Sequence, residues 1–184
     1  MTIISFFIEE WRDFAKKHNG SIRNTKTGAS PVGFGLSSWK KVYLTIPYED
    51  SEIVFVTGEA TRMEIYYKFK KDLQQNFLIY REDSFDKIAL LFNITSEITI
   101  NDEEFDKSFL IKGNNESFVS NILTRDIKSF LVENKKYISN YKLEKNKEVS
   151  VLELNSPFNE NNIAHMEKVL SFMKKSIDVI LRYK

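Results

Sequence analysis

The spacing of apolar residues changes along this 184-residue chain, and each change predicts a different kind of element. Between residues 4 and 15, apolar side chains recur every three or four positions with charged residues between them, which predicts an amphipathic helix over residues 1–19. From residue 42 to 46, and again from residue 63 to 69, apolar and polar residues alternate, which is typical of strands with one buried face. Residues 53–57, which follow a polar turn, predict another strand.

Three further short segments have strand character: residues 76–81, 97–100 and 108–112. Because the connections between these segments are short, we expect antiparallel pairing, with six or more strands and most of the sheet in residues 40–112. Residues 27–38 hold three of the six glycines and predict a long loop. Ser84 is expected to cap a short helix over residues 85–92.

The second half of the chain predicts two helices separated by a hairpin. Asn115 is a suitable N-cap for a helix over residues 116–133, and residues 137–154 form a closing hairpin. Ser156 followed by Pro157 predicts the start of a long C-terminal helix over residues 157–183. We therefore expect one α+β domain spanning residues 1–184, with an antiparallel sheet and the N-terminal, middle and C-terminal helices packed mainly on one face.

The C-terminal helix allows two interpretations. Its apolar residues are spaced alternately three and four apart, as in the seam of a coiled coil, so Met166, Leu170, Met173 and Ile177 could form a homodimer interface. The apolar surface is wider than a coiled-coil seam, because Val169 and Phe172 extend it, and this width favours packing on the sheet.

Composition excludes several classes of function. The chain has no cysteine, which excludes disulfides, thiol catalysis and cysteine-ligated metals. Its 27 basic and 26 acidic residues are balanced, so we expect no nucleic-acid partner. The apolar start of the chain ends at Glu9 without the marks of a signal peptide, and no apolar run is long enough to span a membrane. We expect a soluble, cytoplasmic protein without a cofactor.

Motifs for catalysis are missing. The only histidines, His18 and His165, lie at the ends of two different predicted helices and have no partner motif. Neither a serine nucleophile elbow nor a glycine-rich phosphate loop is present.

Several blocks of residues 40–133 resemble an uncharacterised bacterial family of domains of unknown function. These blocks are Thr61-Arg62 at the start of a strand, Arg81-Glu82 at the end of another, Phe85-Asp86-Lys87-Ile88, and the segment of residues 105–113 that reads FDKSFLIKG. The chain departs from the family pattern at Asn101-Asp102, where the family has Gly-Asp, and at Trp39-Lys40-Lys41, where an arginine-rich strand usually occurs. The resemblance implies a shared fold and no activity.

Two hypotheses of function remain. In the first, the chain is a non-enzymatic binding or scaffold domain for a protein or small ligand, because apolar helix faces are in surplus and catalytic motifs are missing. Its site would be a groove between sheet and helices or an oligomer interface of the last helix. Phe105 and Phe109 are then inward anchors, and Asp106 caps or braces the following turn. In the alternative, Arg62, Arg81, Glu82 and Asp106 gather into the polar site of an enzyme.

Overall fold

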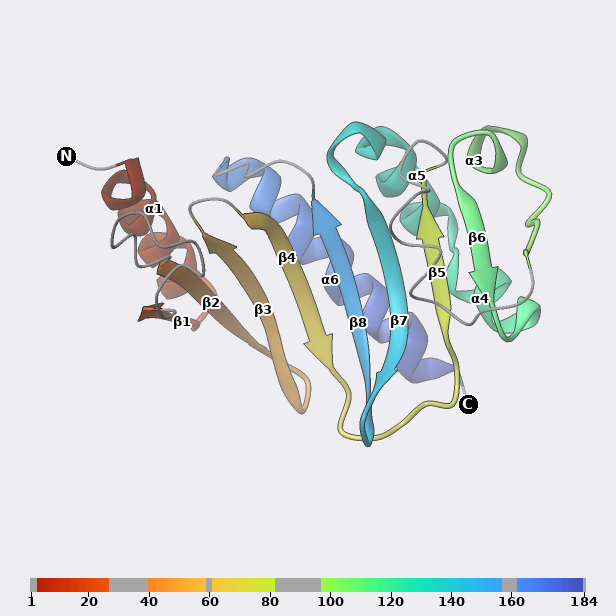
Figure 1. Ribbon diagram of the computed structural model, residues 1–184, viewed down its shortest axis with the longest axis horizontal. Coiled ribbons are helices and arrows are strands. Elements are labelled where there is room, and N and C mark those ends of the chain that lie inside the picture. Colours follow the sequence, from red (N-terminus) through yellow and green to blue (C-terminus); the bar gives the residue numbers. More distant parts are fainter. Residues whose placement is uncertain (1–2, 27–39, 59–60, 82–96, 157–161, 184) are drawn as a thin grey trace, which may run out of the picture.

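The protein is built around one antiparallel sheet of eight strands in the order β1-β2-β3-β4-β8-β7-β5-β6 (Figure 1). The computed structural model describes residues 3–26, 40–58, 61–81, 97–156 and 162–183. The strands are β1 (Ser21–Lys26), β2 (Lys40–Tyr48), β3 (Ser51–Gly58), β4 (Thr61–Lys68), β5 (Phe77–Tyr80), β6 (Leu110–Gly113), β7 (Asn140–Asn146) and β8 (Val149–Ser156). The helices are α1 (Ile3–Lys17), α3 (Glu103–Asp106), α4 (Glu116–Ile122), α5 (Arg125–Glu133) and α6 (Ile163–Arg182), with a 3₁₀ turn, η3, at Lys135–Tyr137.

Two tight hairpins organise the sheet. Strands β2 and β3 pair from Tyr48 and Ser51 outward, and β7 and β8 pair from Asn146 and Val149 outward. Glu49 and Lys147 occupy the first turn positions with φ angles of 50° and 59°, the left-handed conformation that such short hairpins use. The β7–β8 hairpin then inserts between β4 and β5, so the last part of the sheet joins its two halves.

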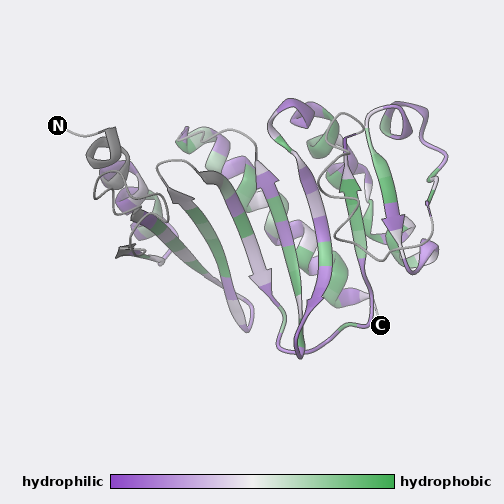
Figure 2. Cartoon of the chain, in the orientation of Figure 1, coloured by the Kyte–Doolittle hydropathy of each residue, from purple (hydrophilic) through white to green (hydrophobic). Residues whose placement is uncertain are grey.

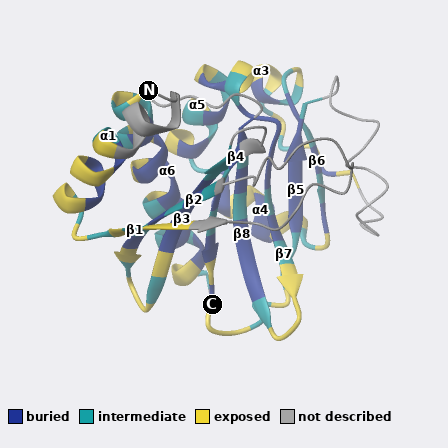
Figure 3. Cartoon of the chain, turned by 60° about the vertical axis from the view of Figure 1, so that its left-hand side comes forward, coloured by how far each residue is buried: buried dark blue, intermediate teal, exposed yellow. Residues whose placement is uncertain are grey.

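Helices α1, α4, α5 and α6 all lie on one face of the sheet (Figure 1). Alternate residues of the strands point toward these helices and form a continuous core, which runs from Leu44 on β2 through Ile65 on β4 and Leu152 on β8 to Phe77 on β5. Hydrophobic and hydrophilic residues alternate along β7 and β8 (Figure 2), and the buried residues gather along the middle of the sheet (Figure 3). The predicted α+β architecture with helices on one face is confirmed.

Two helix boundaries differ from those predicted. The single helix expected over residues 116–133 is two helices, because Leu123 leaves the helical conformation and Thr124 caps α5 by accepting a hydrogen bond from the Ile127 amide. The C-terminal helix begins at Ile163, where the Asn162 side chain accepts from the amides of Ala164 and His165. Ser156 instead ends strand β8, and Pro157 lies outside the described residues.

The sheet also differs in detail. Strand β1 was not predicted, since its sequence SIRNTK is mostly polar; it pairs with β2 along its whole length at the sheet edge. The strand expected at residues 97–100 is reduced to a single bridge between Glu97 and Lys112. The loop predicted at residues 27–38 and the helix predicted at residues 85–92 lie outside the described residues.

Candidate functional site

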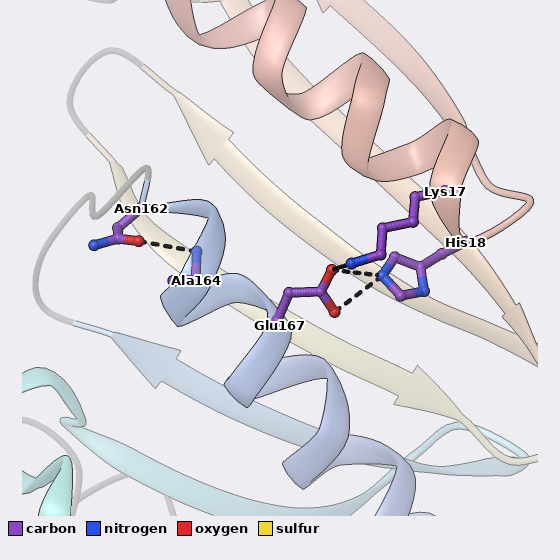
Figure 4. A network of polar contacts seen from close by, with 5 residues as sticks. All are labelled: Lys17, His18, Asn162, Ala164 and Glu167. Carbon is purple, nitrogen blue, oxygen red and sulfur yellow. Dashed lines mark hydrogen bonds and ion pairs between the residues drawn. The ribbon is translucent and has the colours of Figure 1, made fainter.

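Two polar groups of the structure are candidates for function, one on each side of the sheet. The first joins the C-terminal end of α1 to α6 (Figure 4). The Lys17 ammonium lies 2.6 Å from Oε1 of Glu167, and Nε2 of His18 lies 3.0 and 3.1 Å from the two oxygens of the same carboxylate. We call these three residues the α1–α6 clamp.

The α1–α6 clamp is electrostatically satisfied. Burial alone raises the pKa of Glu167, but hydrogen bonds from Lys17 and His18 outweigh it and hold this pKa below its usual value. The His18 ring also packs against Phe14, with ring centroids 4.7 Å apart. Since the charged groups already have partners, the clamp is suited to holding α1 on α6 rather than to binding a ligand.

The second histidine, His165, lies in the first turn of α6, where its ring meets Tyr137 edge-on at 5.5 Å between centroids. The two histidines therefore contact different partners. Among the described residues, no group of three histidine, cysteine, aspartate or glutamate side chains could hold a metal ion.

The residues of the FDKSFLIKG block have structural contacts. Phe105 and Phe109 are buried with ring centroids 5.1 Å apart. The Asp106 carboxylate accepts from the amides of Asp102, at 3.1 Å, and Ile100, at 3.4 Å, so it braces the turn that precedes α3. Asp102 caps α3 by accepting from the Phe105 amide and forms an ion pair with Lys128 of α5. This block attaches α3 to the helix layer.

The two described residues of the enzymatic hypothesis, Arg81 and Asp106, have different partners. Arg81 follows β5 and donates to the carbonyl oxygen of Lys135 at 3.2 Å, whereas Asp106 bonds to backbone amides near α3. Arg62 belongs to β4, but its side chain, like all of Glu82, lies outside the described residues.

The interface predicted on the C-terminal helix is already occupied. Met166, Leu170, Met173 and Ile177 are each at most 2% exposed and belong to the core beneath the sheet. A homodimer seam through these residues therefore gains no support, because the chain's own core buries them.

The second polar group lies on the opposite face of the sheet, on which none of α1, α4, α5 and α6 packs (Figure 1). We call this the open face. Residues in register across the central strands point to it in two rows: Glu64, Asn155 and Asn140 in one, and Tyr66, Glu153 and Lys142 in the next. The name refers to these helices alone and not to exposure to solvent, because Val54 and Val56 on one flank of this face and Leu78 and Tyr80 on the other are buried.

A hydrogen-bonded network links β7 and β8 on the open face. The Lys142 ammonium lies 2.8 Å from the carboxylate of Glu144 and 3.4 Å from that of Glu153. The Asn155 amide donates to the side-chain oxygen of Asn140 at 3.0 Å and to Glu153. These polar groups are buried or half-buried and bond mainly to one another.

Aromatic rings and a carboxylate complete the open face on β2 and β4. The guanidinium of Arg23 lies 5.2 Å from the centre of the Tyr43 ring, and the Lys68 ammonium lies 5.4 Å from that of Tyr66. Burial raises the pKa of Tyr66, and the nearby charge of Glu64 adds to this shift while Arg23 opposes it.

Sequence reasoning did not single out this face. Alternation along one strand shows which of its sides is polar but not which strands lie beside it. The face is formed by the polar residues that alternate with apolar ones along β4, β8 and β7. Only the order of the strands in the sheet brings these residues together.

The fold and the open face define a class of α+β protein in which an antiparallel sheet carries helices on one side and a polar, aromatic surface on the other. No protein-family model and no curated protein matches this chain.

Among solved structures, the crystal structure of the mycobacterial trehalose monomycolate transport factor A, TtfA, is similar, with a TM-score of 0.63 and 10% sequence identity. The match covers 95% of this chain and 94% of that chain. At this identity the likeness shows a shared fold. No described helix of this chain is long and apolar enough to cross a membrane.

Proposed function

We propose that this chain is a non-enzymatic binding domain that docks a partner protein on its open face. The observation that carries the proposal is the one-sided helix layer: it leaves Tyr66, Lys142 and Glu153 half-buried on a face that none of these helices covers. An antiparallel sheet can keep one face for solvent or for a partner, and aromatic rings among paired polar groups are typical of protein interfaces.

Two further observations support the proposal. The side chains of Arg81 and Asp106 bond to backbone groups rather than to each other, so the polar site of the enzymatic hypothesis gains no support from them. The similar structure, TtfA, carries the description of a transport factor, which names a role without naming a reaction.

Site-specific photo-crosslinking in the source cells tests the proposal. A photoreactive phenylalanine analogue replaces Tyr66 on the open face in one variant and the exposed Lys168 on α6 in a matched control. We expect one protein to be crosslinked from position 66 and not from position 168. That protein, identified by mass spectrometry and purified, should bind the unmodified chain directly.

Two results would overturn the proposal. Equal crosslinking from both positions would show that the open face is not selective. No crosslinked protein from position 66, with the variant folded and expressed at the level of the control, would show that the face has no protein partner under the conditions of growth.

A further inference from the structure

On the open face, the carboxylate of Glu64 lies beside aromatic rings and has no hydrogen-bond or ion-pair partner among the described residues. We propose that its partner presents a cationic side chain, arginine or lysine, and that Glu64, Tyr66 and Tyr43 hold the charged group. This inference rests on the proposed function, because it names the chemistry of the partner that the open face would dock.

Glu64 carries the argument. Its side chain is half-buried on β4, yet its carboxylate makes no hydrogen bond or ion pair with any described residue. Its register partner on β8, Asn155, directs its amide instead to Asn140 and Glu153. A carboxylate that is partly removed from water without a cation has lost hydration and gained no compensating contact, so an incoming cation finds a strong acceptor.

The rings beside Glu64 already attract cations from this chain. Tyr66 lies two residues further along the same strand and faces the same side, about 7 Å away. Tyr43 lies in the same row as Glu64, with Val56 of β3 between them. Arg23 lies over Tyr43 and Lys68 over Tyr66, so both rings present surfaces that favour positive charge.

The described lysines of the central strands do not pair with Glu64. Lys142 is shared by Glu144 and Glu153 at 2.8 and 3.4 Å, and Lys68 lies over the Tyr66 ring. The Glu64 carboxylate therefore complements a basic group and opposes an acidic one.

The test uses the purified full chain and two pentapeptides with blocked ends, one in which arginine alternates with glycine and one in which glutamate replaces the arginine. Shifts of backbone amide signals in nuclear magnetic resonance spectra locate each peptide. We expect the arginine peptide to shift amides of β4 and β8, and the glutamate peptide to leave them unchanged.

Variants then assign the contact. Glu64→Gln keeps the shape of the side chain and removes its charge, and it should weaken binding of the arginine peptide about tenfold. Tyr66→Leu should weaken it about threefold through loss of the ring. The matched control Glu133→Gln removes one charge from an exposed position on α5 and should bind the peptide as the natural chain does.

The outcomes separate this inference from the proposed function. If the glutamate peptide shifts β4 and β8 instead, or if Glu64→Gln leaves the affinity unchanged, the cationic contact is wrong while the open face still binds. If the arginine peptide shifts only α1 or α6, or if neither peptide causes a shift, the cationic contact is again wrong, and crosslinking from position 66 decides separately whether the face docks a protein.

Discussion

Gly20 lies where the chain passes from α1 to β1, and there a side chain would not fit. A Cβ atom at this position would lie 2.3 Å from the carbonyl oxygen of Thr45 and 2.6 Å from Cδ1 of Ile46. The neighbouring Asn19 takes a φ angle of 55°, a left-handed conformation that turns the chain out of the helix. This linker therefore sets how closely α1 approaches the sheet edge.

We expect Gly20→Ala to lower the free energy of unfolding by about 1–3 kcal/mol, because the added methyl group must push backbone atoms of β2 aside. Urea denaturation measures the change. Asn19→Gly is the matched control, since glycine adopts the same φ angle without strain, and it should change stability by at most a few tenths of a kcal/mol. Equal stability of Gly20→Ala and the natural chain would contradict the close approach.

Tyr141 is a second residue whose environment has a measurable consequence. Its hydroxyl is buried between β7 and α6 near Ser176, and burial raises the pKa of this phenol above its ordinary value of 10.0. In the unfolded chain the phenol ionises near pH 10, while in the folded chain it stays neutral to higher pH. The unfolded state therefore gains relative stability as the pH rises above 10.

We expect the free energy of unfolding of the natural chain to fall as the pH rises from 10, and to fall less steeply in Tyr141→Phe. Denaturation series at pH 7, 10 and 11 measure the two slopes. Tyr43→Phe, at a half-exposed position, is the control and should keep the natural slope. Parallel pH profiles of Tyr141→Phe and the natural chain would show that this phenol does not link folding to pH.

At the scale of elements, the α1–α6 clamp is the polar connection between the first and last helices of the fold. The carboxylate of Glu167 contacts the side chains of Lys17 and His18. These contacts lower the pKa of the carboxyl group, although burial opposes the shift. A carboxylate with a lowered folded-state pKa contributes stability above its unfolded value, here 4.5, and loses that contribution as the pH falls through the folded-state value.

We expect Glu167→Gln to lower the free energy of unfolding at pH 7 by less than about 1 kcal/mol, because the Lys17 side chain is largely exposed. As the pH falls below 4.5 the difference from the natural chain should shrink, since protonation of Glu167 removes the charge that the glutamine variant also lacks. Denaturation at pH 7 and pH 3.5 measures it, and Glu133→Gln on α5 is the control. A larger deficit at pH 3.5 than at pH 7 would contradict the assigned role of the carboxylate.

At the scale of the whole molecule, the seam of α6 faces the sheet of its own chain. Leu170 is 2% exposed in the middle of this contact. We expect Leu170→Ala to lower the free energy of unfolding by about 2–5 kcal/mol through the cavity that it leaves, with no change in subunit number. Denaturation and light scattering measure the two quantities. A dimer that separates into stable monomers in this variant would contradict the assignment of the seam to the core.

The periodicity of single segments was enough to predict the class of fold. Alternation along residues 63–69 identifies the buried face of that strand, and the three- and four-residue spacing identifies the buried face of the last helix. In the structure the apolar face of each element is buried, as expected. The polar strand β1 could not be predicted, because pairing with β2 through backbone hydrogen bonds, rather than its side chains, defines it. The break at Thr124 was also missed, since an apolar stripe can continue across two short helices.

The open face could not be predicted for a different reason. Glu64 and Glu153 are 89 residues apart in sequence and lie on adjacent strands only because the β7–β8 hairpin inserts beside β4. Strand order depends on the packing of the whole sheet, which no local pattern contains. Phe105 and Asp106, which stood out in the sequence, instead hold α3 in place: Phe105 packs against Phe109, and Asp106 accepts a hydrogen bond from the amide of Asp102.

The central claim is that a partner protein docks on the open face, and footprinting by hydroxyl radicals tests it most directly. The radicals oxidise accessible aromatic and aliphatic side chains, so Tyr43 and Tyr66 report on the open face, and the exposed Leu181 reports on α6. With the crosslinked partner added in excess, the account predicts that oxidation of Tyr43 and Tyr66 falls while that of Leu181 stays unchanged. Protection of Leu181 with unchanged oxidation of both tyrosines would contradict it.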